Sequence, residues 1–512
     1  MTFISRILGY VRDAVIAAIF GAGLSADAFF VAFRISNLFR RLLGEGALTS
    51  SFIPVYTDVL HERSPEEARR FVSSVFIIAL IVLTLITIPC IIFSAEIVAF
   101  MAPGFVDAPD GKFALTVTLT QWMFPFMVFV GLMAVAMGVL HSFRHFTMPA
   151  IAPVLLNISI IASALLLRGY FPSAVYALAV GVLVGGLLQL LIQLPFLRRY
   201  GMFPTFCFNI KDPAIKRIFL LMGPAIVGVG VYQLNIFITL RFASHLAEGS
   251  IAYLYYGSRL MELPLGIFVV SLATVILPSL SSDVTKKDFV SFKRSLSHAM
   301  RLVNFVCIPA TVGLIILAYP IVDVLFLRGA FGAGDARETA YVLYFFAAGI
   351  VPIALSRIFI SVYYSLKDTK TPVVIAVVCV VVNLIGCMLL IGPLGHGGLA
   401  LATTIAATAN FIMLAMVLKA RVSAVDFISV VSASAKSLLA AIIMGVVLYV
   451  ALNLIGWPDS GIFLKAGLIA VFVCGGALLY FMLSILFKIK ESAVIKAIVV
   501  EKFSSKRFRK EL

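Results

Sequence analysis

Charged residues are scarce in this chain, and acidic residues are the scarcer kind. Only 12% of the 512 residues are Asp, Glu, Lys or Arg, whereas 62% are hydrophobic. The 24 acidic residues cannot balance the 40 lysines and arginines, which leaves a formal net charge of +16. A composition this apolar excludes a soluble enzyme on a membrane anchor and indicates a multi-pass membrane protein.

The residue patterns that accompany nucleotide binding, metal binding and catalysis are also missing. No GxxxxGK[ST] segment occurs, so direct use of ATP is not expected. The six cysteines form no CxxC pair, which is typical of small core residues and not of a disulfide or zinc framework. The short loops hold no constellation of carboxylates or histidines. We therefore expect no enzyme activity, no catalytic residue, no cofactor and no metal.

Long apolar runs make up most of the chain, for example 72–93 and 373–391. A helix that crosses a bilayer needs about 20 such residues, and the runs between polar breaks predict about fourteen of them. The first run, from Thr2, is interrupted by charges and lacks a small-residue cleavage site, so we expect a retained helix and not a signal peptide. The predicted fold class is all-α.

The basic residues concentrate in alternate loops, which is the positive-inside pattern. This placement explains the net charge without a nucleic-acid partner, and it predicts that both termini lie in the cytoplasm. Residues 488–512 alternate basic and apolar residues, so we expect an amphipathic cytoplasmic tail on the inner leaflet. The basic loops contain Arg63, Arg69, Arg70, Arg144, Arg198, Arg199, Lys211, Lys216, Arg217, Lys286, Lys287, Lys293, Arg294, Lys367, Lys370, Lys419 and Arg421.

The chain repeats itself at an offset of about 224 residues. SFIPVY is matched by VILPSL, the Gly104 region by the Gly329 region, and HSFRHFTMP by YSLKDTKTP. Two halves with an even number of helices keep the same orientation, which is typical of transporters with a central cavity. We predict two parallel six-helix lobes, with two further helices after them. The predicted domains are 1–200 (N-lobe), 201–425 (C-lobe), 426–487 (two last helices) and 488–512 (tail).

Five arginines lie within the apolar runs. Arg6 and Arg12 belong to the first run, Arg34 and Arg40 to the second, and Arg259 to a much later one. Each charge near a bilayer centre costs roughly 2.5 to 3.5 kcal/mol, so five would cost roughly 12 to 17 kcal/mol. They are therefore expected to face a hydrated cavity. Because guanidinium groups suit phosphate, a diphosphate-bearing cargo is favoured.

Contacts with lipid headgroups or with acidic side chains would also stabilise some of these charges. Arg6, near a helix end, could extend to the headgroups, and Arg12 could pair with Asp27. The acidic residues are too few to neutralise all of the arginines, so pairing explains only part of the cluster. Glu262, three residues after Arg259, is placed to hold it as an i,i+3 pair when no cargo is bound.

Several segments resemble the lipid II flippase MurJ (MviN) family, within the multidrug/oligosaccharidyl-lipid/polysaccharide exporter superfamily. The densest likeness is at residues 5–55, SRILGYVRDAVIAAIFGAGLSADAFFVAFRISNLFRRLLGEGALTSSFIPV. It returns in YYGSRLMELPLGI, LRGAF, SLKDTKTP and GGLALAT. The resemblance implies a fourteen-helix bundle in the bacterial inner membrane. Such a protein moves the undecaprenyl-diphosphate-linked peptidoglycan precursor to the outer leaflet by alternating access, for cell wall synthesis.

The resemblance also implies roles for single residues. The family's cavity arginines match Arg6, Arg12, Arg40 and Arg259, and Arg34 stands where relatives often carry a basic residue. Asp13, Asp27, Glu45 and Glu262 are then the acidic partners, and the last two helices line a groove for the lipid tail. Asn383 and Thr403 keep neutral ligand types of an ion site, but Thr239 and Cys387 replace the expected acids, which argues against sodium coupling.

The expected partners are lipid II, membrane lipids and peptidoglycan polymerases, and the chain is expected to act as a monomer. Two alternatives stay open within transport. One is a flippase for another polyprenyl-diphosphate-linked oligosaccharide, since the diphosphate is common to both cargoes. The other is a MATE-like cation-coupled exporter, although cationic drugs would call for an acidic cavity and the excess charge here is basic.

Overall fold

The computed structural model describes residues 2–41, 48–108, 110–269, 278, 280–286, 288–421, 427–458 and 461–492. Within these residues the chain is helical and contains no β-strand, which confirms the predicted all-α class. It divides into two compact units. Unit 1 comprises 1–253 and 326–335, and unit 2 comprises 254–325 and 336–512. The predicted lobe boundaries stay a prediction.

The helices of unit 1 are α1 (Thr2–Phe20), α2 (Leu24–Phe39), α3 (Thr49–Glu62), α4 (Pro65–Ile92), α5 (Ser94–Met101), η2 (Pro103–Phe105), α6 (Lys112–Met123), α7 (Phe126–Ser142), α8 (Thr147–Leu166), α9 (Tyr176–Leu191), α10 (Leu194–Arg199) and α11 (Pro213–Ala243). Helix α12 (Ser250–Pro264) begins in unit 1 and continues in unit 2. Unit 2 then holds η3 (Leu265–Val269), α14 (Phe289–Ile316), α15 (Ala318–Phe326, which ends in unit 1), α16 (Ala333–Ala348), α17 (Ile350–Ser365), α18 (Lys370–Arg421), α19 (Phe427–Ile455) and α20 (Ile462–Leu486).

Nine helices of the described chain are long and apolar enough to span a membrane, or ten if the bent pair α16 and α17 forms one span. This confirms a multi-pass membrane protein. The predicted count of fourteen stays a prediction, because several segments do not stand out as separate spans. Helix α1 carries three charged residues, α2 has only 16 residues, and α18 joins two helices across a break at Gly395.

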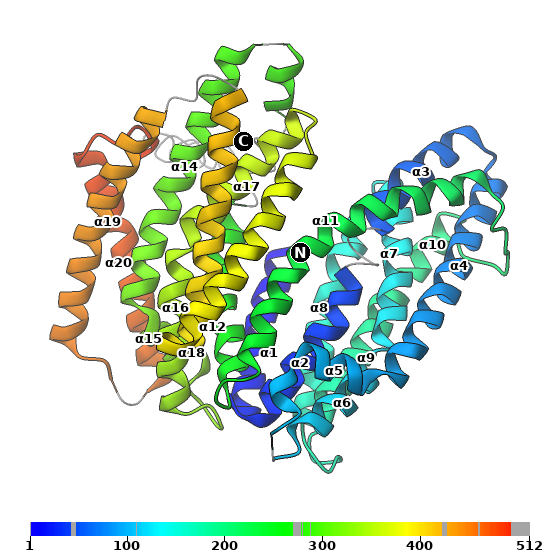
Figure 1. Cartoon of the computed structure of the whole chain (residues 1–512), viewed down its shortest axis with the longest axis horizontal. Helices are drawn as coiled ribbons and strands as arrows, with labels where there is room; N and C mark the ends of the chain where they lie inside the picture. The colour runs from blue at the N-terminus through cyan, green and yellow to red at the C-terminus, as the bar shows by residue number, and fades with distance from the viewer. Residues whose placement is uncertain are drawn as a thin grey trace, which may run out of the picture. The chain divides into compact units, whose positions relative to one another are not determined.

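In unit 1, α8 packs against both α1 and α9, and α2 packs against α6. Helices α3, α4 and α7 pack against one another (Figure 1). They share one apolar core, whose aromatic residues include Phe52, Tyr56 and Phe71. Close van der Waals packing of such large rings stabilises the contact between helices, since in lipid there is no hydrophobic driving force between them. The site residues on α1 and α2 are thus held by a well-packed scaffold.

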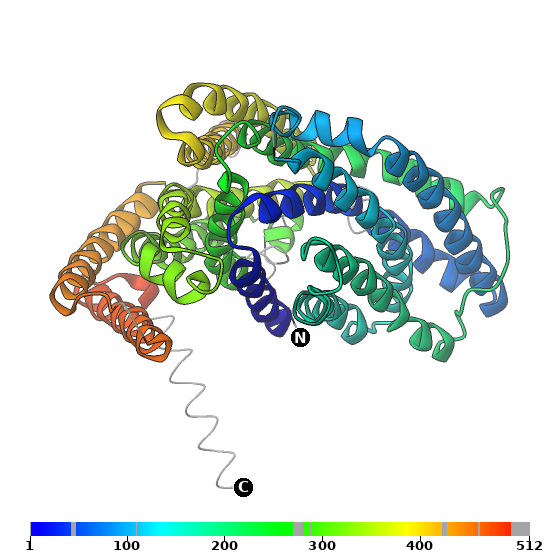
Figure 2. The ribbon, with the colours of Figure 1, turned by 90° about the horizontal axis from the view of Figure 1, so that it is seen from below.

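In unit 2, the last two helices are tied closely to α14. Helices α19 and α20 lie side by side in both views (Figures 1 and 2), and both contact α14. Tyr480 donates to the backbone carbonyl of Phe305 at 2.9 Å, and Lys465 pairs with Asp323 at 2.9 Å. Helix α20 is therefore held to α14 and α15 by polar contacts as well as by apolar packing.

The sequence repeat has a local structural counterpart in two turns. Arg144 and Lys367, which the repeat predicts to be equivalent, both adopt left-handed backbone, with φ of 56° and 59°. A non-glycine residue in this region is uncommon. In each turn the next residue donates its N–H five residues back, His145 to Leu140 and Asp368 to Tyr363. The same helix-ending motif therefore occurs at both places.

Candidate functional site around the buried charges

Asp27 is a buried carboxylate with partners at the starts of α6 and α12 in unit 1. Its side chain lies in the first turn of α2 and is only 1% exposed. The carboxylate accepts from Lys112 Nζ at 2.7 Å and from the backbone N–H groups of Gly249 and Ala252 at 2.9 Å each. Those two N–H groups open α12, so Asp27 caps this helix from a distant part of the chain.

Lys112 is the first residue of α6, where a positive charge is disfavoured by the helix dipole. Two groups offset that cost. Asp27 neutralises the ammonium, and the ring of Phe105 lies under it with Nζ 4.3 Å from the ring centroid. Since the Lys112 side chain is only 9% exposed, the pair is a buried one.

The start of α2 is capped in return. Glu248, just before α12, accepts from the backbone N–H of Leu24 through Oε1. Leu24 and Glu248 are 224 residues apart, which is the offset of the sequence repeat. The α1–α2 turn and the α11–α12 turn thus cap each other reciprocally, as two equivalent segments related by an approximate two-fold axis would.

Two glycines permit a second reciprocal contact between repeat-equivalent loops. Gly329 and Ala330 lie against the end of α1, where the Ala330 N–H donates to the Ala18 carbonyl at 2.8 Å. Gly104 lies against the end of α11, where its N–H meets the Ser244 hydroxyl at 3.1 Å. A Cβ at either glycine would overlap the neighbouring backbone carbonyl, so only glycine allows this approach.

Arg12 is buried in unit 1 and held by two side chains. Its Nε and Nη2 donate to Asp13 Oδ1 at 3.0 and 2.6 Å, and Nη1 donates to Asn157 Oδ1 at 3.1 Å. Asn157, on α8, is positioned in turn by donating to the Ser5 carbonyl at 3.1 Å. The alternative pairing of Arg12 with Asp27 is not found, because Asp13 and Lys112 take those places.

The other predicted arginines of unit 1 are half-buried. Arg6 lies on α1 and Arg34 on α2. Arg40 follows α2 and donates from Nε to Asn37 Oδ1 at 2.8 Å. Glu45, the predicted acidic partner in the turn after Arg40, lies outside the described residues.

Arg259 belongs to α12 in unit 2. It forms the predicted i,i+3 pair with Glu262 at 3.1 Å, and its guanidinium lies 5.3 Å from the centroid of the Tyr255 ring. The Arg259 side chain keeps 34% of its surface exposed and that of Glu262 keeps 49%. This arginine is thus far more accessible than Arg12.

The predicted ion-site residues show no metal-like arrangement in the described part of the chain. Thr403 donates to the Leu399 carbonyl at 3.0 Å, as Thr239 does to Asn235. Asn383 is buried, with Cys387 Sγ 3.9 Å from its Oδ1. No group of three His, Cys, Asp or Glu side chains that could hold a metal is present among these residues.

The structure adds three residues that the sequence analysis did not single out. These are Lys112, Asn157 and Glu248, which hold Asp27, Arg12 and the start of α2. Only Glu248 carried a usable signal, since it stands 224 residues after Leu24. Convergence of Arg259 with the arginines of unit 1 on one chamber stays a prediction.

Comparison with known proteins identifies the family. The model of the family described as "Lipid II flippase MurJ" matches residues 16–465. A probable lipid II flippase MurJ of Buchnera aphidicola is 35% identical over 469 residues, covering 91% of each chain. The lipid II flippase MurJ of Burkholderia cenocepacia is 36% identical over 427 residues, covering 82% of each.

Solved structures agree with the sequence relatives. A lipid II flippase MurJ in an inward-closed conformation superposes with a TM-score of 0.81 at 28% identity, over 95% of this chain and 98% of that one. An inward-facing MATE family transporter of the MOP superfamily has a TM-score of 0.71 at 16% identity, over 82% of this chain and 95% of that one, which shows the shared fold alone. The chain belongs to the lipid II flippase MurJ family.

Proposed function

We propose that this chain is a flippase that moves lipid II, the undecaprenyl-diphosphate-linked peptidoglycan precursor, from the inner to the outer leaflet. The family match over residues 16–465 carries the proposal. It supports a role in peptidoglycan synthesis, and we propose that the protein acts there as a transporter without a catalytic step of its own.

The intramembrane arginines support an anionic cargo. Arginine is the residue best suited to a diphosphate, because its planar group stays charged and donates two parallel hydrogen bonds. Arg12 is preoriented by Asp13 and Asn157, whereas Arg259 is accessible beside Glu262. We propose that the diphosphate displaces Glu262 from Arg259 and is bound jointly by Arg6, Arg12, Arg34 and Arg40.

The contacts of Asp27 support a mechanism in which helices change their contacts during transport. Its carboxylate joins α2 to α6 and to the N-terminus of α12, and Glu248 closes the same contact from the other side. We propose that this set of caps holds one state of the alternating-access cycle together. Release of Asp27 from the α12 N–H groups then accompanies the opposite state.

The loops and the family of this chain support a proposal for its location and orientation. The basic alternate loops support an orientation with both termini in the cytoplasm of a bacterium. In this orientation the chain works in the inner membrane and delivers lipid II to the side where peptidoglycan polymerases act. We propose that it does so as a monomer, with the apolar helices α19 and α20 beside the lipid tail.

A cation-coupled exporter is the competing function, and the MATE likeness is its only support. Charge argues against it. Cationic drugs need carboxylates facing the cargo, whereas Asp13 and Asp27 are almost fully buried and already neutralised by cations of the protein. Recognition of the diphosphate alone does not distinguish lipid II from other polyprenyl-diphosphate-linked sugars, because all of them carry this group.

Complementation tests the proposal in cells. The chain is expressed in a strain depleted of its own lipid II flippase, and lipid II on the outer leaflet is measured. We expect restored export by the native chain and by Arg70→Ala, whose side chain is 66% exposed at the start of α4, and loss of export by Arg259→Ala. Absence of export by a native chain that reaches the membrane in normal amount would refute the proposed function.

A further inference from the structure

An apolar groove lies between α4 and α11 in unit 1, away from the buried charges. Every residue that lines it is hydrophobic. Both helices qualify as membrane spans, so the groove is formed by segments that lie in the bilayer. Its lining residues are Leu48, Val75, Ile78, Ala79, Val82, Leu83, Ile86, Ile215, Ile218, Phe219 and Met222.

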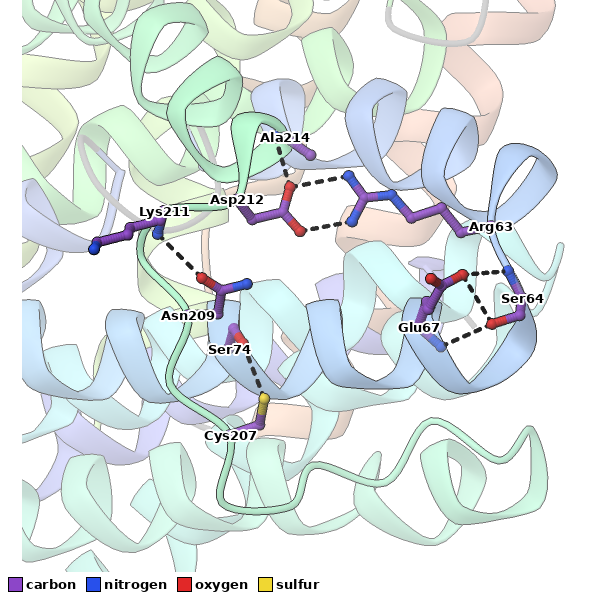
Figure 3. A network of polar contacts seen from close by, with 9 residues as sticks. All are labelled: Arg63, Ser64, Glu67, Ser74, Cys207, Asn209, Lys211, Asp212 and Ala214. Carbon is purple, nitrogen blue, oxygen red and sulfur yellow. Dashed lines mark hydrogen bonds and ion pairs between the residues drawn. The ribbon is translucent and has the colours of Figure 1, made fainter.

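The linker before α11, residues 201–212, is fastened along α4 next to this groove. Arg63 forms a bidentate pair with Asp212 at 2.6 and 2.9 Å, and Ser74 contacts Cys207 at 3.4 Å (Figure 3). Ser73 accepts from the backbone N–H of Thr205 at 3.0 Å. These contacts hold an otherwise irregular segment in a defined position against α4.

The linker presents apolar side chains outward despite its irregular backbone. Phe206 is 94% exposed, and Phe208 and Ile210 are each 55% exposed. Such a cluster would be unfavourable in water but is typical of a segment that lies in the membrane interface. Three polar side chains of the linker contact the protein: Thr205 contacts Ser73, Cys207 contacts Ser74, and Asp212 binds Arg63. The linker is therefore held to the protein through these contacts, while Phe206, Phe208 and Ile210 stay available to lipid.

Two exposed lysines lie near the start of α11, at the end of the groove that is next to the linker. Lys216 directly follows the groove residue Ile215, and Lys211 precedes α11 with its side chain directed away from Asp212 (Figure 3). Neither lysine has an acidic partner among the described residues. The neighbouring arginines differ, since Arg63 binds Asp212 and Arg217 binds Asp58. Lys211 and Lys216 thus add two positive charges close in sequence to the groove residue Ile215.

We propose that this groove binds an acyl chain of an anionic phospholipid whose headgroup phosphate is bound by Lys211 and Lys216. The apolar lining accepts the chain, the exposed phenylalanines of the linker lie at the level of the glycerol backbone, and the lysines provide charge complementarity. In the proposed orientation this end of α4 is cytoplasmic, where basic residues near the bilayer attract anionic lipid. The site is separate from the cargo arginines.

Quenching of an introduced tryptophan by brominated lipids tests the proposal. The full-length Phe219→Trp variant is reconstituted in vesicles that contain a low fraction of brominated phosphatidylglycerol or of brominated phosphatidylcholine. The signal of the parent chain, which holds Trp122 and Trp457, is subtracted. Ile81→Trp is the matched control, because Ile81 is 41% exposed on α4 and does not line the groove, while Phe219 is 46% exposed.

We expect phosphatidylglycerol to quench Trp at 219 more strongly than phosphatidylcholine does, with a preference of about fivefold for each lysine, equivalent to about 1 kcal/mol per basic residue. At position 81 the two lipids should quench equally. Lys211→Gln with Lys216→Gln should abolish the preference at 219. Equal quenching by both lipids at 219, an equal preference at 81, or a preference that survives loss of both lysines would overturn the proposal. Displacement by inorganic phosphate would instead assign the lysines to a soluble anion, which also overturns it.

Discussion

Two ion pairs, Asp27–Lys112 in unit 1 and Arg259–Glu262 in unit 2, differ in almost every respect. The first joins α2 to α6 across 85 residues of sequence, and its side chains are 1% and 9% exposed. The second lies within one turn of α12, with its side chains 34% and 49% exposed. Asp27 also caps α12 through two backbone N–H groups, whereas Glu262 accepts from Arg259 on its own helix.

This difference separates charges that maintain the structure from charges that can exchange partners. A buried and fully bonded carboxylate is costly to disturb, because each partner left behind stays without water. A half-exposed i,i+3 pair contributes only a few tenths of a kcal/mol, so an incoming phosphate can displace it at little cost. This contrast supports the proposed roles of Asp27 in structure and gating and of Arg259 in cargo binding.

The largest expected effect is at the buried pair. Lys112→Ala leaves the Asp27 carboxylate buried beside two N–H groups but without its cation, and we expect about 3 to 5 kcal/mol of lost stability. Thermal unfolding of the purified protein in detergent measures it. A melting temperature equal to that of the native chain would show that the pair carries no such role.

A double variant sharpens this result. Asp27→Leu with Lys112→Leu removes both charges at once, so no buried ion is left uncompensated. We expect most of the stability to return, minus about 1 kcal/mol for the lost cap on α12. Stability as low as that of Lys112→Ala alone would place the importance of the site in the cap and not in the ion pair.

Variants of Arg259 and Arg12 should differ in how they affect lipid II binding and the amount of folded protein. Arg259→Gln removes a charged hydrogen-bond donor from an accessible site, so we expect lipid II binding to weaken about 10-fold to 100-fold at normal abundance. Arg12→Gln should also lower the amount of folded protein, because the buried Asp13 then loses its ion pair with Arg12. Binding of lipid II by native mass spectrometry, compared with membrane abundance, distinguishes the two. Reduced abundance of Arg259→Gln would contradict the distinction.

The Arg63–Asp212 pair is intermediate in exposure, at 31% and 10%, and supplies a pH test. Hydrogen bonds from Arg63 hold the pKa of Asp212 below its ordinary value of 3.8. A carboxyl group with a lowered pKa stabilises the folded state at a pH above its ordinary pKa. This contribution is lost as the pH falls through the folded-state pKa. Asp212→Asn should therefore remove about 1 kcal/mol or less at neutral pH and flatten the acid limb of the unfolding curve. An unchanged acid limb would exclude this contribution.

The smallest expected effect is at the exposed pair. Glu262→Gln should change stability by only about 0.2 to 0.5 kcal/mol, the usual size for an i,i+3 ion pair on a helix. Its measurable consequence should be tighter cargo binding, since the Glu262 carboxylate then no longer competes for Arg259. A large loss of thermal stability in this variant would remove the contrast between the two pairs.

The helical class and the membrane character were predictable, because long apolar runs leave no other structure in a bilayer. Arg12 and Asp27 stood out for the same reason, since a charge inside an apolar run is conspicuous. The i,i+3 pair of Arg259 and Glu262 followed from helix geometry alone. In each case the signal is local in sequence.

The partners of these charges were not predictable in the same way. Lys112 follows a loop that is poor in basic residues, and Asn157 is one of many polar residues within helices. Their roles depend on which helices pack together, which is long-range information. Glu248 is the exception, because the offset of the sequence repeat relates it to Leu24. The contact between these two residues shows that the repeat offset can predict which turns lie together.

Translocation of fluorescent lipid II across vesicle membranes tests the central claim most directly. The native chain, Arg12→Gln, Arg259→Gln and the surface control Arg70→Gln are reconstituted in equal folded amounts. We predict that the native chain and Arg70→Gln move the lipid at the same rate, while both cavity variants lose most of the activity. Native rates in Arg12→Gln and Arg259→Gln would contradict the claim that these guanidinium groups bind the diphosphate.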